Sequence, residues 1–335
     1  MDERAVLQRL MAGPVSGDAL AREIGQTRAA VWKRVQALRE AGVPIDARPG
    51  TGYTLARPLD LLEASRIARG LSDAARQRLA GCDVAWTIDS TNSALMAAPV
   101  PADGRARVLL AERQTAGRGR RGRHWASPLA AHLYLSLART FGGGLARLGG
   151  LSLVAGVATV EALHGLGIAA PRLKWPNDVV VPDPGGLRKL GGLLVEGSGE
   201  HAGPVRAVIG LGLNVRMPAA AAASIGQPWC DLVALTGVDA VDRNTLASAV
   251  LDHWLPALDT FERDGLAPFL GRYAAVDALR GRAVVVQGEH ARIEGVARGI
   301  AGDGGLEVML PGGDTRVVHA GEASLRLAAG EEATA

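Results

Sequence analysis

The chain has 335 residues, 48% of them hydrophobic, and a formal net charge of +3. At about 150 residues per domain, this length predicts two or three folded domains with real cores, which excludes a disordered or fibrous chain. Cys82 and Cys230 lack metal-ligand spacing and the N-terminus lacks an apolar leader, so we expect a reduced, cytoplasmic protein. The apolar run at 151–170 contains Glu161 and His164, which predicts a buried helix there and no membrane span.

Residues 1–57 contain three short helical patterns followed by a hairpin pattern. Apolar residues at helical spacing mark a first helix near 6–11. Ser16 and Thr27 are in position to cap a second helix and a third that runs to about Ala41, with Gly25 in the turn between them. Residues 43–55 have the pattern of two short strands around Pro49-Gly50. This order predicts a winged helix-turn-helix, whose helix-turn-helix begins at about Gly17 and continues through Gln36.

The third helix has two distinct faces. Val31, Val35 and Leu38 share one apolar stripe, which predicts the core face. The opposite arc is basic and amide-bearing, the composition of a helix that enters a DNA major groove. It contains Arg28, Ala29, Trp32, Lys33 and Gln36. Residues 1–57 hold nine Arg and Lys against six Asp and Glu, so they account for the whole net charge of the chain. A small helical domain for protein contacts is the alternative.

Residues 58–275 alternate between helical and strand-like patterns, which predicts a large α/β domain. Helices are expected near 61–79, 149–166 and 244–264. Strands are expected at 84–88, 108–111, 133–138, 173–175, 190–196 and 205–213. We expect the alanine run at 219–223 to be a flexible loop or a helix end.

Residues 276–328 change in character. Five short strand-like runs are separated by glycine-rich turns such as the one at 302–305, and this spacing predicts a small β-barrel. Residues 329–335 are expected to form a disordered tail.

A glycine- and arginine-rich run, QTAGRGRRGRHW at 114–125, lies between two of the expected strands. Glycine lets a backbone approach a ligand closely, and arginine supplies forked donors for phosphate or carboxylate. The chain has no G-x-x-x-x-G-K-[ST] motif, which excludes a P-loop. The run predicts a mobile cationic loop that closes over an anionic small molecule, with a plain basic surface loop as the alternative.

Four further motifs fall in the same domain. A hydroxyl- and amide-bearing segment, Asp89 to Asn92, follows an expected strand and either binds a polar head group or caps a helix. The other three are KWPND at 174–178, KLGGLLVE at 189–196 and GLGLNV at 210–215. The G-x-G in the last motif lacks the third glycine of a dinucleotide fingerprint. Only three of the 37 basic residues are lysine, and Lys174 and Lys189 both lie in these motifs.

Taken together and in this order, the motifs resemble those of the biotin–protein ligases. With its leading helix-turn-helix, the chain from about residue 16 to residue 327 resembles the bacterial family of bifunctional biotin ligases and biotin-operon repressors. Lipoyl ligases have a related catalytic fold but lack the GRGRRGR loop. The resemblance implies a multidomain α+β protein with a winged helix-turn-helix, a central α/β catalytic domain similar to that of class II aminoacyl-tRNA synthetases, and a C-terminal SH3-like β-barrel.

The resemblance also implies a two-step reaction. Biotin and ATP form biotinyl-5′-adenylate and pyrophosphate, and the biotinyl group then passes to a lysine of the biotin carboxyl carrier protein of acetyl-CoA carboxylase. Mg²⁺ is expected to accompany ATP, with its protein ligands unassigned. Arg120, Lys189 and Asp178 are the catalytic residues that the resemblance implies.

Further roles follow residue by residue from the same resemblance. Four residues would hold the biotin head group: Ser90, Thr91, Asn92 and Gln114. Four in the loop would cover the biotin tail and phosphate, with Arg120 retaining the intermediate: Gly117, Arg118, Gly119 and Arg120. Trp125 would pack near the adenine, and Lys189 would contact carboxylate or acyl-phosphate oxygens. Asn177 and Asp178 would help position metal, phosphate or the incoming lysine, and Gly192 and Asn214 complete the adenylate-binding set. Lys174 would either bind pyrophosphate or form a structural ion pair.

In the family that the chain resembles, the adenylate promotes a homodimer whose two winged helices span a palindromic operator. We therefore expect biotin operator DNA and a second copy of the chain as partners, and no membrane. The helix-turn-helix departs from the family at Trp32-Lys33, which leaves the operator sequence open. Two alternatives stay open: a ligase whose winged helix does not regulate, and a ligand-sensing transcription factor without enzyme activity.

Overall fold

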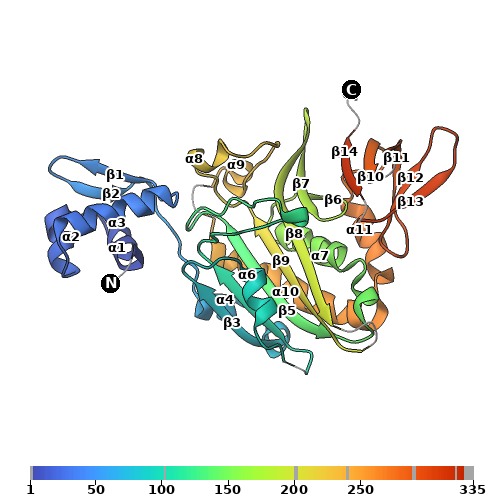
Figure 1. Ribbon diagram of the computed structural model, residues 1–335, viewed down its shortest axis with the longest axis horizontal. Helices are drawn as coiled ribbons and strands as arrows, with labels where there is room; N and C mark the ends of the chain where they lie inside the picture. Colours follow the sequence, from blue (N-terminus) through green and yellow to red (C-terminus); the bar gives the residue numbers. More distant parts are fainter. Residues whose placement is uncertain are drawn as a thin grey trace.

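The computed structural model describes residues 3–101, 103–199, 203–238, 241–288, 292–320 and 323–327. Figure 1 shows three parts along the molecule: a small helical domain with a hairpin, a large sheet with helices, and a small β-domain at the opposite end. This order of parts confirms the predicted fold class. The tail expected at 329–335 lies outside the described residues.

The N-terminal domain has the predicted winged helix-turn-helix arrangement. Its elements are α1 (Glu3–Met11), α2 (Gly17–Glu23), α3 (Arg28–Glu40) and the hairpin of β1 (Ile45–Arg48) and β2 (Gly52–Leu55). Ser16 and Thr27 accept hydrogen bonds from the backbone of the first turn of α2 and of α3, so both predicted caps form. Gly25, in the turn between the two helices, has a φ of +63°.

The central domain is built on a seven-stranded sheet of order β3-β4-β5-β9-β8-β7-β6. Only β3 and β4 are parallel. The strands are β3 (Leu79–Ala85), β4 (Ala106–Ala111), β5 (Leu133–Phe141), β6 (Arg172–Lys174), β7 (Asp178–Asp183), β8 (Gly186–Gly199) and β9 (Val205–Leu213).

Helices cover both faces of this sheet. The long helices α7 (Leu151–Gly165) and α10 (Arg243–Asp264) pack together on one face, and α6 (Thr91–Ala97) packs on the other, against β5 and β9. The remaining short helices are α4 (Ala64–Gly70), α5 (Asp73–Gln77), α8 (Ala219–Ala222), α9 (Leu232–Thr236), α11 (Leu270–Val276) and the 3₁₀ turns η1 (Arg120–Gly122), η2 (Leu145–Leu148) and η3 (Ala267–Phe269). Because both faces are covered, almost every residue of β5 is buried.

Two predictions in this domain need correction. The strand expected at 84–88 ends at Ala85, because the chain beyond it leaves β3 and crosses to α6 with only an isolated bridge at Ile88. The single helix expected over 61–79 is two helices, since the N–H and hydroxyl of Ser72 donate to Asp252 and the same residue caps α5. Strand β7 was not predicted, and the alanine run forms α8.

The C-terminal part is a five-stranded antiparallel sheet of order β13-β12-β11-β10-β14. Its strands are β10 (Ala283–Gly288), β11 (Arg292–Ile300), β12 (Leu306–Met309), β13 (Thr315–Val318) and β14 (Ala323–Leu327). The Trp175 indole is buried and donates to the carbonyl of Gly304 at 3.0 Å, which joins this sheet to the KWPND motif.

One stretch of the described residues, Leu145–Gly165, has the length and apolar composition of a membrane span. Most of its helical part, α7, is buried between the sheet and α10. This burial is that of a core helix in the central domain.

Candidate active site

The face of the central sheet that α6 covers contains a group of glycines. The register pairs Gly212 of β9 with Gly192 of β8, and Gly192 with Asp178 of β7. Gly210 is paired with Ser136 of β5. Because side chains alternate along a strand, Gly210 and Gly212 lie on the same face. We call Gly192, Gly210 and Gly212 the glycine row.

Two members of the glycine row make room for a side chain from another part of the domain. A Cβ on Gly210 would lie 2.3 Å from Asn92 Oδ1, and a Cβ on Gly212 would lie 2.5 Å from Trp125 Cε2. Ordinary contacts between carbon atoms begin at about 3.5 Å. Glycine is therefore required at both positions for Asn92 and Trp125 to lie against the sheet.

The predicted head-group residues meet at the N-terminus of α6. Ser90 caps this helix, and the Thr91 N–H donates to Gln114 Oε1 at 2.9 Å. The buried Ser136 hydroxyl lies 2.6 Å from Asn92 Oδ1 and 2.7 Å from Thr91 Oγ1. Asn92 Oδ1 can only accept, so the Ser136 hydroxyl donates its one proton to Asn92. Towards Thr91, the Ser136 oxygen can then act only as an acceptor. Because Gln114 Oε1 accepts from Thr91, the N-terminus of α6 and the start of the arginine-rich segment are joined by a hydrogen bond.

Glu196 of β8 joins this network to the arginine-rich loop, and sequence reasoning did not single it out. Its Oε2 accepts from Asn92 Nδ2 at 2.8 Å, and its Oε1 accepts from Arg118 Nη2 at 2.9 Å. The other Arg118 nitrogen, Nη1, donates to Ser93 Oγ at 2.5 Å. Arg118 therefore fastens the loop to both α6 and β8.

The arginine-rich segment, residues 114–127, folds as a narrow hairpin between β4 and β5, and we call it the lid. The Trp125 N–H donates to the Gly117 carbonyl at 2.9 Å, and the Gly119 N–H donates to the Arg123 carbonyl at 2.7 Å. At the tip, Arg121 has a φ of +57°, a left-handed conformation that costs a non-glycine residue free energy. The prediction of a loop between two strands is confirmed.

Arg120 extends from the lid towards the edge of the sheet and the C-terminal domain. Its guanidinium donates to Asn177 Oδ1 at 3.3 Å and to the carbonyl of Ala320. Asn177 is itself held, because its Nδ2 donates to the Leu193 carbonyl at 2.6 Å. Burial lowers the pKa of Arg120, which nevertheless stays protonated at neutral pH. A half-buried cation with so few partners is suited to an anionic ligand.

Lys189 provides a second cation beside the glycine row. Its Nζ lies 2.7 Å from Asp178 Oδ1 and 5.5 Å from the centroid of the Trp125 ring, within range of a cation–π interaction. A Cβ on Gly192 would approach both Lys189 Nζ and Asp178 Oδ1 to 3.4 Å. The buried Trp125 Nε1 has no protein acceptor among the described residues, which leaves a donor for a ligand in the same place.

Asn214 contacts the backbone beside Lys189, whose carbonyl lies 3.4 Å from Asn214 Nδ2. The side chain is buried, and its Nδ2 donates to the Cys230 carbonyl at 3.1 Å. The segment it holds runs beside β8, where the Lys189 N–H donates to the Pro228 carbonyl and Trp229 pairs with Lys189. Asn214 thus positions Lys189 through the backbone, and Trp229 is a neighbour of the site that the sequence patterns did not reveal.

No group of three or more His, Cys, Asp or Glu side chains suitable for a metal ion occurs among the described residues. Asp178, beside Lys189, is the carboxylate nearest to the two cations of the site. Mg²⁺ in nucleotide sites is typically held by one or two carboxylates together with substrate phosphates. The donor set therefore fits a Mg²⁺ ion that arrives with ATP and does not fit a metal held by protein ligands alone.

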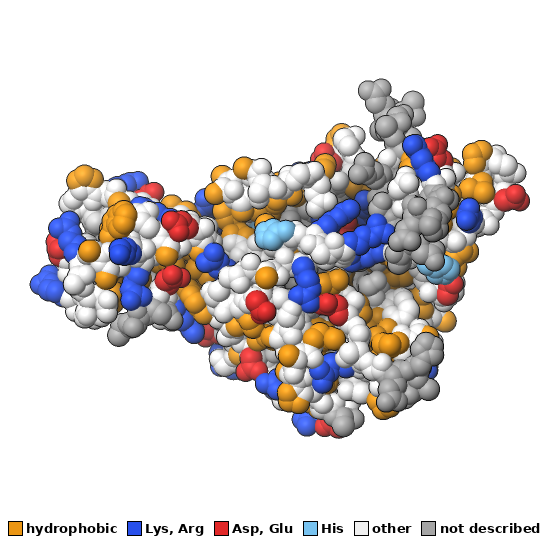
Figure 2. Space-filling view, viewed as in Figure 1, with side chains coloured by type: hydrophobic (Ala, Val, Ile, Leu, Met, Phe, Trp, Pro, Cys, Tyr) orange, Lys and Arg blue, Asp and Glu red, His pale blue; other side chains and the backbone are white. Residues whose placement is uncertain are grey.

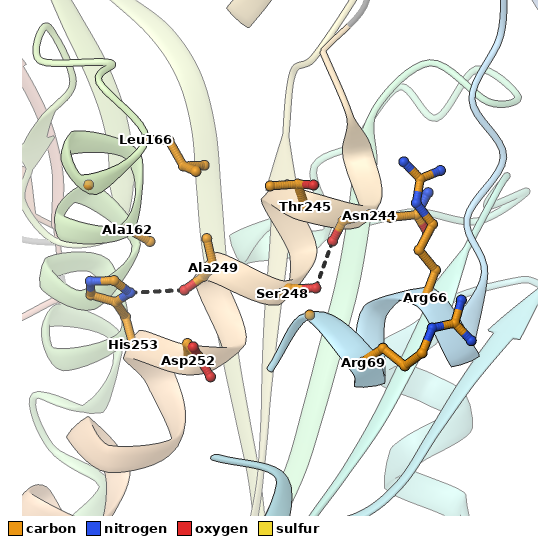
Figure 3. Close-up of a pocket in the computed structure, with 12 residues that line it drawn as sticks. Arg66, Arg69, Ala162, Leu166, Asn244, Thr245, Ser248, Ala249, Asp252 and His253 are labelled. Atoms are coloured by element: carbon orange, nitrogen blue, oxygen red, sulfur yellow. Dashed lines mark hydrogen bonds between the residues drawn. The ribbon is translucent and has the colours of Figure 1, made fainter. Parts of the chain in front are cut away.

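A cavity of about 500 Å³ lies far from these motifs, between α4, α7 and α10. Figure 3 shows His253 on one side of it and Arg66 and Arg69 on the other. Arg66 is already paired with Asp60 at 2.9 Å. The cavity lies on the face of the sheet opposite the glycine row, so it is separate from the candidate active site.

The predicted DNA-binding residues lie on one exposed face of α3. Arg28, Ala29, Trp32 and Lys33 are exposed and Gln36 is half-buried, whereas the stripe expected to face the core is fully buried. Trp32 is 54% exposed, which is unusual for an indole. Figure 2 shows basic side chains on this domain and, separately, gathered over the middle of the molecule where β7 and β8 lie in Figure 1.

Family models match each of the three parts of the chain. Residues 3–54 match an HTH domain, residues 84–214 match the Biotin/lipoate A/B protein ligase family, and residues 280–326 match the Biotin protein ligase C terminal domain. The fold and the site thus define the class of the protein as a biotin protein ligase with an N-terminal helix-turn-helix.

Individual relatives narrow this class. The chain is 38% identical over 313 residues to the Bifunctional ligase/repressor BirA of Escherichia coli K12, and the match covers 93% of each chain. It is also 38% identical to the Biotin--[acetyl-CoA-carboxylase] ligase of Mycobacterium tuberculosis, where the match covers 72% of this chain and 87% of the relative. The structure of the biotin protein ligase from Aquifex aeolicus in complex with biotin and ATP is 28% identical, with a TM-score of 0.61 over 75% of this chain and 100% of that one. The chain belongs to the BirA family of bifunctional biotin ligase/repressors.

Proposed function

We propose that the protein activates biotin with ATP to form biotinyl-5′-adenylate and transfers the biotinyl group to a lysine of the biotin carboxyl carrier protein. The observation that carries this proposal is the convergence of Arg120, Lys189 and Trp125 beside the glycine row, on the same face as the polar N-terminus of α6. Polar groups for a head group lie at one end of the row and cations for phosphate at the other.

The first step joins two anions, and the cations of the site meet that requirement. A biotin carboxylate oxygen attacks the α-phosphorus of ATP, the bond to the bridging oxygen breaks, and pyrophosphate leaves. Negative charge grows on the phosphate oxygens, where preorganised cations in a partly desolvated site stabilise it. Lys189 and Arg120 would supply that charge, with Lys189 held in place by Asp178 at 2.7 Å.

In the second step the acceptor lysine attacks the acyl carbon of the adenylate, AMP leaves with the bonding electron pair, and the amine loses a proton. The acyl carbonyl oxygen becomes negative on the way, and Lys189 is again the cation at hand. The adenylate hydrolyses if water reaches it, so the lid, with Arg120 towards the phosphate, would retain it until the acceptor binds. Mg²⁺ would neutralise the ATP phosphates when bound, with Asp178 beside it.

Ser90, Thr91, Asn92 and Gln114 would bind the biotin head group, and Trp125 would lie near the adenine. Asn177 would orient Arg120, since its amide oxygen accepts from that guanidinium at 3.3 Å. The described residues give Asn214 a backbone-holding contact, so we assign it to the support of Lys189 and not to direct ligand contact.

The winged helix would bind operator DNA through the exposed face of α3, as a homodimer formed with the adenylate bound. We further propose that both activities take place in the cytoplasm. Burial raises the pKa of the half-buried Cys82 thiol to about 12 and that of the buried Cys230 thiol to about 11, so both are unreactive and need no oxidising compartment.

Transfer of labelled biotin to a purified carrier domain, with MgATP, tests the enzyme half of the proposal. We expect label on the carrier that depends on ATP and on its acceptor lysine. No label, from a protein with a cooperative unfolding transition, would overturn that half.

A gel shift on the promoter region of the biotin genes from the same organism tests the repressor half. We expect binding that strengthens when biotin and ATP are added together. Absence of binding at low salt, where phosphate contacts are strongest, would leave a ligase whose winged helix does not regulate.

A further inference from the structure

Glu196 occupies a position between two hydrogen-bond donors. Asn92 Nδ2 lies 2.8 Å from one carboxylate oxygen, and Arg118 Nη2 lies 2.9 Å from the other. An ionised carboxylate only accepts hydrogen bonds, so it satisfies both partners at once. A neutral amide of the same size has one accepting and one donating end, and its donating end would oppose one of the two donors.

The carboxylate fixes the orientation of the Asn92 amide. Both N–H groups of Asn92 Nδ2 are directed to acceptors, Glu196 Oε2 and the Leu194 carbonyl at 3.3 Å. Asn92 Oδ1 must then face the other way, where it accepts from Ser136 at 2.6 Å and lies over Gly210. Asn92 thereby turns its accepting end, and not its donating end, to the glycine row.

The same carboxylate holds the lid. Arg118 is two residues before Arg120, and both of its terminal nitrogens are committed, one to Glu196 and one to Ser93. Charge-assisted bonds of this kind are stronger than neutral ones. The head-group end of the site and the base of the lid are therefore joined at one side chain, although Asn92 and Glu196 are 104 residues apart in sequence.

We propose that Glu196 is a positioning residue that presents Asn92 Oδ1 as an acceptor to an N–H group of the ligand and anchors the lid over it through Arg118. The cyclic urea of biotin offers two N–H donors, whereas a ring without N–H groups gains nothing from such an acceptor. Glu196 then contributes to selectivity for a cyclic urea. This inference rests on the proposed function, because it deepens the assignment of the biotin end of the site.

The test is the Glu196→Gln variant, assayed by calorimetry for biotin binding without ATP and by steady-state transfer for ATP. We expect the biotin Kd to rise roughly ten- to a hundredfold. The variant loses one charge-assisted hydrogen bond, and the Asn92 amide is no longer held in one orientation. The KM for ATP should rise several-fold less than the biotin Kd, because Lys189 and Arg120 keep their own contacts and Arg118 still holds the lid to Ser93. If Glu196 were purely structural, the biotin Kd and the KM for ATP would instead rise together and the melting temperature would fall.

Glu161→Gln is the matched control. Glu161 of α7 pairs with Arg272 of α11, and its side chain is 30% exposed against 29% for Glu196. It lies on the opposite face of the sheet, so its removal should leave the biotin Kd unchanged. An unchanged biotin Kd in Glu196→Gln, with wild type binding biotin normally, would refute the role of Glu196 and leave the proposed function standing.

If Glu196→Gln does not fold, Glu196→Asp makes the same test. Aspartate keeps the accepting charge but is one methylene shorter, so it can bond only one of the two partners. The biotin Kd should then rise roughly three- to tenfold, which corresponds to the loss of about one neutral hydrogen bond. A biotin Kd equal to that of wild type would overturn the proposal. If wild type itself does not bind biotin, the proposed function fails and the inference with it.

Discussion

The two glycines of β9 allow a paired test of the site. In Gly210→Ala the new methyl group would lie 2.3 Å from Asn92 Oδ1, and in Gly212→Ala it would lie 2.5 Å from Trp125 Cε2. Neither glycine has a positive φ, so alanine costs the backbone nothing in either place. The two substitutions therefore act through the side chains they displace, one at each end of the ligand site.

The size of each effect follows from the contacts that would be lost. Asn92 must rotate away by more than 1 Å, roughly the shortfall from ordinary contact, and it then loses its bonds to Ser136 and Glu196. The Trp125 ring must lift from the sheet and leave its 5.5 Å contact with Lys189. Overpacking of this kind costs about 1–3 kcal/mol. At about 1.4 kcal/mol per factor of ten, each KM should rise roughly five- to a hundredfold.

Steady-state transfer assays with biotin and ATP varied separately measure the effect. We expect Gly210→Ala to raise the KM for biotin and Gly212→Ala to raise the KM for ATP, each with little change in the other. Gly81→Ala, in β3 of the same sheet, is the control, because a Cβ there meets nothing within 4 Å. Equal changes in both constants in either variant, or no change in Gly210→Ala, would refute the assignment of the two ends.

Three other substitutions probe separate parts of the molecule. Arg120→Gly removes a cation that retains the adenylate, so we expect released intermediate to label bystander proteins; retention at the wild-type level would contradict its role. Lys33→Ala should weaken DNA binding without altering biotin transfer. In titrations at several salt concentrations, the slope of log K against log salt concentration should fall by about one. Glu112→Gln leaves Arg243, only 3% exposed, as a buried charge without its 2.8 Å partner, and urea unfolding should show a loss of about 3–5 kcal/mol. A loss below about 1 kcal/mol would mean that water already solvates the pair.

Local signals in the sequence predicted local structure well. The caps Ser16 and Thr27 and the turn at Gly25 fixed the helix-turn-helix, because a cap satisfies the backbone of its own helix and depends on no distant contact. The lid was also predictable as a loop between two strands, since strand-like patterns flank the run on both sides and closely spaced glycines weaken a strand. The order of the motifs indicated the family before any of their contacts were known.

Contacts between distant strands were beyond the sequence patterns. The meaning of the two glycines at 210 and 212 depends on what crosses above β9, and their spacing alone resembles a fragment of a nucleotide fingerprint. Glu196 was passed over because its partners come from α6 and the lid, which only the register of β8 brings to it. The strand expected at 84–88 ends at Ala85 for a related reason: its pairing with β4 stops there, which the apolar pattern does not show.

The end of the lid links the ligand site to the DNA-binding domain. Where the lid returns to β5, the Leu129 N–H donates to the carbonyl of Ala41 at 2.7 Å, at the C-terminal end of α3, and the Leu129 side chain is buried in the core of the winged helix. The next residue, Ala130, is held at a φ of +55°, a strained conformation that the N–H bond to the Glu112 carbonyl maintains. On the other side, the buried Tyr134 hydroxyl donates to the Pro128 carbonyl at 2.9 Å. A shift of the lid at its base must therefore either break these bonds or carry the end of α3 with it, and the first option leaves buried polar groups unpaired. The base of the lid and the C-terminal end of α3 are thus joined both through the backbone of Leu129 and through its side chain in the winged-helix core.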